Sequence, residues 1–141
     1  MTRILIDTDV ILDFFSDRQA FAESASKIFS LCESKEIRGF ITPVIISNVY
    51  YLLRQTAKHE KVIEKLILLV SITEILVLDK NVIIQALNSD FKDFENALQN
   101  YSAELDKEVS LIVTNNVKDF KNSKLAVMTP NNYMKIKSAS H

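Results

Sequence analysis

The chain alternates short apolar runs with longer stretches in which apolar residues recur every three or four positions. The short runs are apolar at consecutive positions, which is typical of strands that are buried on both faces. They cover residues 3–6, 39–41, 75–78, 111–113 and 125–128. The longer stretches have the spacing of amphipathic helices. They cover residues 20–31, 46–53, 62–70 and 94–105.

This alternation predicts an α/β fold, a three-layer α/β/α sandwich around a mainly parallel sheet of four or five strands. Thr42–Pro43 and Thr129–Pro130 each predict a helix start, with Thr as the N-cap and Pro at the first helical position. The length of 141 residues is typical of one domain, so we expect residues 1–141 to fold as a single unit. In such sheets, ligands bind outside the carboxyl ends of the strands.

Composition limits the possible functions. The 17 basic and 18 acidic residues give a net charge of -1, so a nucleic-acid partner must meet a local basic patch. The single Cys excludes Cys-rich zinc sites, and the single Gly excludes Gly-rich phosphate loops. The longest later apolar run, residues 66–72, is too short to span a bilayer, and no segment has a signal-peptide pattern. We therefore expect a cytoplasmic protein without membrane association.

Acidic and amide residues directly follow two of the predicted strands. Asp7 and Asp9 come after the first strand, and Asn116 and Asp119 come after the fourth. A carboxylate at the end of a buried strand must be solvated, hydrogen-bonded or bound to a cation. These residues are therefore candidates for a binding or catalytic site.

Two predicted helices carry polar residues among apolar ones. Asp93, Asn96 and Asn100 are spaced to share one helix face, opposite the apolar stripe, and Asn48 interrupts an apolar run. An oxygen-rich set of carboxylates and amides suits Mg²⁺ or Mn²⁺ better than zinc. Such an ion can activate water and stabilise phosphoryl displacement, so phosphodiester hydrolysis is the natural reaction class.

At these residues the chain resembles the PIN-domain family, in particular small VapC-like toxins. Residues 4–13, Thr42–Pro43, residues 93–98 and residues 112–120 carry the resemblance. The family implies a three-layer α/β/α fold and Mg²⁺- or Mn²⁺-dependent ribonuclease activity. Asp7 falls at the first metal-binding acid of the family, and Asn116 and Asp119 fall in its last acidic cluster.

Two positions depart from the family pattern. Ser47 and Asn48 occupy the region of the second acid, usually Glu, and Asn96 replaces the third acid. Asn keeps an oxygen ligand but lacks the negative charge. Asp93, one turn before Asn96, is the better substitute, because Glu95 is expected to point about 100° away from Asn96.

The resemblance implies a metal-dependent endoribonuclease. The candidate metal ligands are Asp7, Asp119, Asn116, Asn96 and Asp93, of which Asp7, Asp119 and Asn96 are also the candidate catalytic residues. Lys118 is the candidate RNA contact, and Asn48 marks the second-helix position of the site. The resemblance also implies a homodimer and a toxin–antitoxin pair, in which a small antitoxin protein covers the acidic pocket.

Other interpretations stay open. The departures at Asn48 and Asn96 favour a catalytically weak or inactive PIN-like domain that binds RNA or a protein partner. A phosphatase or another small-molecule hydrolase would use the same metal chemistry. Single residues also have structural alternatives: Asp7 as a helix cap, Asp119 as a turn residue, and Asn48 as a buried, hydrogen-bonded amide.

Overall fold

Five parallel strands form one sheet in the order β3-β2-β1-β4-β5. The structure is a computed structural model that describes residues 1–16 and 19–139. The strands are β1 (Thr2–Ile6), β2 (Ile37–Ile41), β3 (Glu74–Ile75), β4 (Leu111–Val113) and β5 (Ala126–Met128). The predicted parallel sheet is confirmed, but the strand expected at 75–78 is wrong in extent. Only Glu74 and Ile75 pair with β2, at the edge of the sheet.

Helices connect the strands. They are α1 (Thr8–Ser16), α2 (Gln19–Glu33), α3 (Pro43–Arg54), α4 (His59–Ile72), α5 (Lys80–Leu87), α6 (Phe94–Leu105) and α7 (Pro130–Ala139), with a 3-10 helix η1 (Val117–Phe120). Both predicted Thr-Pro helix starts are confirmed. Thr42 Oγ1 accepts a hydrogen bond of 3.1 Å from the Ile45 amide at the start of α3. None of the helices among residues 1–16 and 19–139 is long and apolar enough to cross a membrane.

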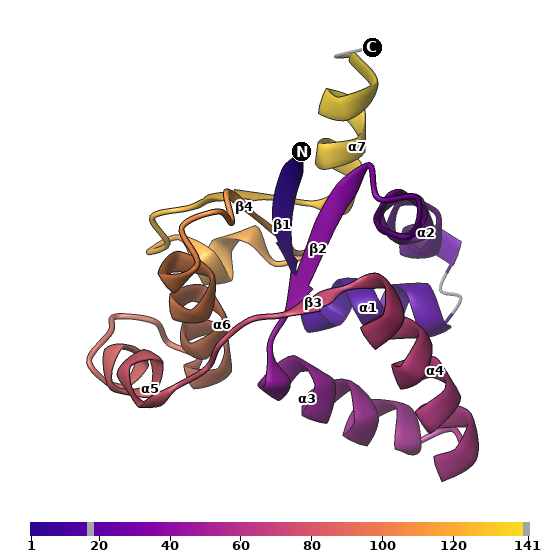
Figure 1. The fold of residues 1–141 in the computed structure, drawn as a ribbon, viewed down its shortest axis with the longest axis horizontal. Helices are drawn as coiled ribbons and strands as arrows, with labels where there is room; N and C mark the ends of the chain where they lie inside the picture. The colour runs from indigo at the N-terminus through magenta and orange to yellow at the C-terminus, as the bar shows by residue number, and fades with distance from the viewer. Residues whose placement is uncertain (17–18, 140–141) are drawn as a thin grey trace.

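The sheet lies between two groups of helices, as in the predicted three-layer sandwich. In Figure 1, α5 and α6 lie to the left of β1 and β2, whereas α2 and α4 lie to the right. The central strands are apolar at consecutive positions because both of their faces are covered. Ile4, Leu5 and Ile6 of β1 and Ile112 of β4 are fully buried. The carboxyl ends of these two strands are therefore held rigidly by the core.

The strand order reverses between β1 and β4. From β1 the chain first adds β2 and β3 on one side, and then crosses to add β4 and β5 on the other. Ligand sites of parallel sheets lie at such a reversal. Ile6 is paired with Val113, and the Asp7 amide donates a hydrogen bond of 3.0 Å to the Val113 carbonyl. Asp7 and Thr114 are thereby placed side by side at the reversal.

Candidate active site

A cavity of about 490 Å³ opens at the carboxyl ends of β1 and β4. It is lined by Asp7, Thr8, Asp9, Leu12, Asn48, Tyr51, Leu52, Asp93, Glu95, Asn96, Gln99, Asn116 and Asp119. All five candidate metal ligands and Asn48 are therefore brought together around one space. Lys118 lies outside this lining and faces a neighbouring hollow, which Asp119 also lines.

Asp7 is the most buried carboxylate of the cavity lining. Its side chain accepts hydrogen bonds of 2.8 Å from the Thr8 amide and from the Thr114 hydroxyl. Burial raises the pKa of the Asp7 carboxyl, and the nearby charge of Asp119 raises it further. The hydrogen bonds with Thr114, Thr8 and Gln99 lower this pKa but do not cancel the effect of burial. Because α1 begins at Thr8, the same contact satisfies the first backbone amide of this helix. Asp7 thus supports the start of α1 and also lines the cavity.

Asp9 joins α1 to the loop after β4. Its Oδ2 accepts hydrogen bonds from the Asn115 amide at 3.1 Å and from Asn116 Nδ2 at 2.8 Å. Its Oδ1 is buried and has no hydrogen-bond partner among the described residues. Burial and the neighbouring charge of Asp7 raise the pKa of Asp9 to about 7. Ionised Asp9 and Asp7 would therefore both be stabilised by a cation in the cavity.

The structure corrects the predicted face of α6. Asp93 precedes the helix as its N-cap, and its Oδ1 accepts a hydrogen bond of 3.0 Å from the Asn96 amide. Asn100 is fully buried and donates to Glu104 Oε2 at 2.8 Å, away from the cavity. Phe94 and Leu105, the first and last residues of the helix, are apolar but exposed. The helix instead turns a partly polar face inwards.

Gln99 is the site residue that the sequence analysis missed. Its side chain is only 2% exposed, lines the cavity and forms a hydrogen bond with Asp7. Its Oε1 has no hydrogen-bond partner among the described residues. The available signal was its spacing, because Gln99 lies three positions after Asn96 on the same helix face.

Glu95, over which the sequence favoured Asp93, also lies at the cavity. Both residues line the cavity, and Glu95 Oε2 accepts a hydrogen bond of 2.8 Å from Asn48 Nδ2. The start of α6 faces α3, so Glu95, the second residue of α6, reaches across to Asn48 on that neighbouring helix. The carboxylate closest to Asn48 is thus supplied by α6 rather than by α3.

The donor atoms fit a hard divalent cation with few protein ligands. Among the described residues, no group of three or more His, Cys, Asp or Glu side chains is arranged to hold a metal ion. The cavity instead offers the carboxylates of Asp7 and Asp119 together with amide oxygens, including the unpartnered Oε1 of Gln99. Mg²⁺ is commonly bound through one or two carboxylates and keeps several waters. The residues present therefore fit Mg²⁺ or Mn²⁺.

Comparison with known proteins agrees with this geometry. The model of the PIN domain family matches residues 3–118, so the chain belongs to this family. No curated protein matches the sequence. The fold is similar to a toxin–antitoxin complex from Klebsiella pneumoniae, with a TM-score of 0.67 and 21% identity, over 90% of this chain and 97% of that one.

Two further solved structures share the fold. VapBC-1 from nontypeable Haemophilus influenzae has a TM-score of 0.66 and 15% identity, over 92% of this chain and 99% of that one. VapC20 from Mycobacterium tuberculosis, a Sarcin-Ricin loop cleaving toxin, has a TM-score of 0.59 and 16% identity, over 77% of this chain and 86% of that one. At such identities the likeness shows the fold alone. The predicted family and fold class are confirmed.

Proposed function

We propose that this PIN-domain protein is a metal-dependent endoribonuclease that hydrolyses RNA phosphodiester bonds. The observation that carries the proposal is that buried Asp7 and Asp119 line the same oxygen-rich cavity at the strand reversal. Membership of the PIN domain family supports it. The Sarcin-Ricin loop cleaving activity named for the similar VapC20 supports RNA as the substrate.

Asp7 and Asp119 would hold Mg²⁺ or Mn²⁺, with Asn96, Asn116 and Asp93 as further oxygen ligands. When bound, the ion would supply an acidified water and stabilise charge on the phosphate.

The chain's own groups fix the carboxylates. The Thr114 hydroxyl and the Thr8 amide hold both oxygens of Asp7, and Asn116 is held by Asp9. This network keeps Asp7 oriented before any substrate arrives, which lowers the cost of reorganisation.

One observation favours a second function. The cavity has amides at Asn48 and Asn96, and among the described residues no group of three or more His, Cys, Asp or Glu side chains is arranged to hold a metal ion. A lower ligand charge weakens cation binding. The chain would then be a catalytically weak or inactive PIN-like domain that binds RNA or a protein partner.

Cleavage of a mixed pool of structured and single-stranded RNA separates the two functions. We expect cutting with Mn²⁺ or Mg²⁺ that is lost with EDTA and falls at least about 100-fold in Asp7→Asn. No cutting at high protein concentration, or cutting that survives Asp7→Asn, would favour the binding function instead.

The toxin–antitoxin role, with a small antitoxin over the acidic cavity and a homodimer of this chain, belongs to the same proposal. The Klebsiella structure is a toxin–antitoxin complex, and the Haemophilus structure is VapBC-1. On α4, an apolar hollow of about 360 Å³ is lined by Ile63, Leu66, Ile67 and Val70. Light scattering of the purified chain would give its oligomeric state, and a monomer at all concentrations would contradict the homodimer.

A further inference from the structure

A second hollow adjoins the acidic cavity. Its volume is about 440 Å³, and it is lined by Asp90, Phe91, Lys92, Asp93, Asn96, Lys118, Asp119, Lys121 and Asn122. It shares Asp93, Asn96 and Asp119 with the cavity that contains Asp7. Volumes of ~300–1,000 Å³ are typical of sites for small ligands. A ligand bound in the hollow would therefore lie directly beside the proposed metal ligands.

The hollow brings three lysines together with three aspartates. Lys92, Lys118 and Lys121 all line it, and within the described part of the chain none of them pairs with a carboxylate. Lysine ammonium groups without ion-pair partners are the usual contacts of nucleic-acid phosphates. The lysines are therefore available to a phosphate that extends from the acidic cavity.

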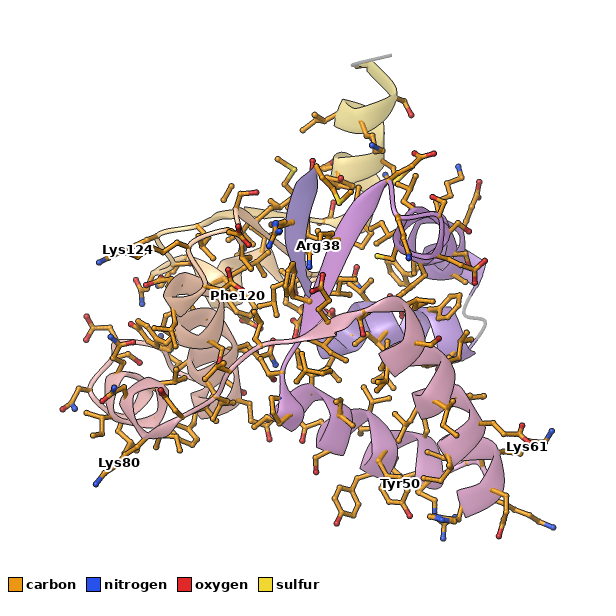
Figure 2. All side chains as sticks on the ribbon, viewed as in Figure 1. Arg38, Tyr50, Lys61, Lys80, Phe120 and Lys124 are labelled. Carbon is orange, nitrogen blue, oxygen red and sulfur yellow. The ribbon has the colours of Figure 1, made fainter. Side chains whose placement is uncertain are left out.

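Phe91 gives the hollow an aromatic surface. Its half-buried ring packs edge-on against Tyr101 at 5.8 Å and against Phe120 at 6.1 Å between ring centroids. Figure 2 shows Phe120 beside α6, between that helix and the sheet. The Asn122 side-chain amide also donates to the Asp90 carbonyl at 3.3 Å, which ties together the two loops that form the hollow. The ring of Phe91 is thus held at a fixed orientation.

Three carboxylates in the lining argue against a site for a simple polyanion. The Asp93 carboxylate accepts from the Asn96 amide, and Asp90 and Asp119 add further acceptors. Carboxylates beside lysines and an aromatic ring fit a nucleotide better than free phosphate. The amino groups of a base can donate to the carboxylates, and the flat face of the base can stack on the ring. Stacking on an aromatic ring and backbone contacts with lysines are how single strands are commonly bound.

We propose that this hollow binds a nucleotide of single-stranded RNA next to the bond that is cut. Its base stacks on Phe91, and its phosphates contact Lys118 and Lys121. This inference rests on the proposed ribonuclease function and extends it from the reacting phosphate to the neighbouring nucleotide.

The phosphate contacts are tested by measuring how tightly a short, fluorescent single-stranded RNA binds. The Asp7→Asn variant is used as the parent, so that the RNA is not cut during the measurement. Lys118→Gln with Lys121→Gln should weaken binding about tenfold and reduce the slope of log affinity against log salt by about 1.4. The matched control is Lys61→Gln with Lys107→Gln, which removes the same charge elsewhere. Figure 2 shows Lys61 on α4, on the opposite side of the view from Phe120. Equal weakening and equal salt slopes in the two double variants would overturn the inference.

Substitution of Phe91 tests the base contact. Phe91→Leu keeps apolar packing but removes the aromatic face, and should weaken binding about tenfold, whereas Phe91→Tyr should bind like the parent. Unfolding temperatures of both variants check that the fold is kept. Equal affinity of Phe91→Leu and Phe91→Tyr would overturn stacking on this ring.

The cleavage assay separates this inference from the proposed function. If RNA binds through the hollow but the natural chain does not cut it with Mn²⁺, the proposed function fails and the binding site stands. If the chain cuts RNA and the hollow variants behave like the control, only the inference fails.

Discussion

The two ends of the sheet differ in how their charges are balanced. At the amino end, Arg38 pairs with Glu74 and Arg3 pairs with Glu108, and both guanidinium groups lie over the ring of Phe40. Figure 2 shows Arg38 beside β1 and β2. Each of these two guanidinium groups has an anion and an aromatic surface beside it, so its charge is balanced by the chain itself.

At the carboxyl end, carboxylates gather without such partners. Among the described residues, no Lys or Arg pairs with Asp7, Asp9 or Asp119. Burial raises the pKa of both Asp7 and Asp9. Partly buried charge without a partner is costly, and it persists at sites where a ligand supplies the missing charge. The difference between the two ends therefore favours the carboxyl end as the place of the proposed function.

The largest difference between the two ends of the sheet is expected from a substitution of Gln99. Gln99→Met keeps the approximate size of the side chain but removes its amide group. The variant therefore loses both the hydrogen bond with Asp7 and the unpartnered Oε1. Affinity for Mn²⁺, measured by titration calorimetry, should fall about 10–100-fold. The control is Ser102→Ala, because Ser102 is buried on the same helix but does not line the cavity. Unchanged affinity in Gln99→Met would remove Gln99 from the site.

The stability of the metal-free protein should depend on pH through Asp9. Because the folded state raises the pKa of Asp9 from 3.8 to about 7, it binds more protons than the unfolded chain between these values. The free energy of unfolding in EDTA should therefore fall as pH rises from 4 to 7, by on the order of 2 kcal/mol after allowance for solvent screening.

Asp9→Asn should make this pH profile flatter, because Asn can still accept from the Asn115 amide but does not ionise. Urea unfolding across this pH range measures the effect. A profile as steep in Asp9→Asn as in the natural chain would show that the Asp9 charge is not the destabilising one.

A third test adds charge instead of removing it. Asn96→Asp places another carboxylate in the cavity and should raise the affinity for Mn²⁺ about tenfold. Asn131→Asp, at an exposed position of α7, makes the same charge change outside the cavity lining. If Asn96→Asp binds no better than Asn131→Asp, then Asn96 is already a competent ligand or lies outside the coordination sphere.

The smallest effect is expected at the amino end. The side chains of Arg38 and Glu74 are 34% and 43% exposed, and ion pairs that are open to solvent contribute less than about 1 kcal/mol. Arg38→Gln with Glu74→Gln should lower the free energy of unfolding by no more than that and leave RNA cleavage unchanged. A loss of cleavage in this double variant would mean that the two ends are coupled.

The sequence predicted those parts of the fold whose pattern follows from burial. Residues 111–113 have the observed bounds of β4 because both faces of that strand are covered. The run at 75–78 misled because Ile75 and Val77 are exposed at the sheet edge, where apolar residues do not indicate a covered strand. Helix α5 was missed for a similar reason, because exposed Ile83 and Leu87 obscure its amphipathic pattern.

Candidate residues that directly follow strands could be predicted from the sequence, whereas candidate residues on packed helices could not all be found. Asp7 and Asp119 followed from their places after the first and fourth strands, and the structure puts both in one cavity. The roles of Gln99 and Glu95 depend on how α6 is rotated against the sheet and α3, which the sequence pattern does not determine.

The most direct test of the account is a crystal structure with Mn²⁺, recorded to show its anomalous scattering. We predict one strong peak in the cavity, in contact with the carboxylates of Asp7 and Asp119. A cavity without a peak at saturating Mn²⁺, or a peak bound only elsewhere on the chain, would contradict the claim that the unpaired carboxylates at this end of the sheet hold a divalent cation.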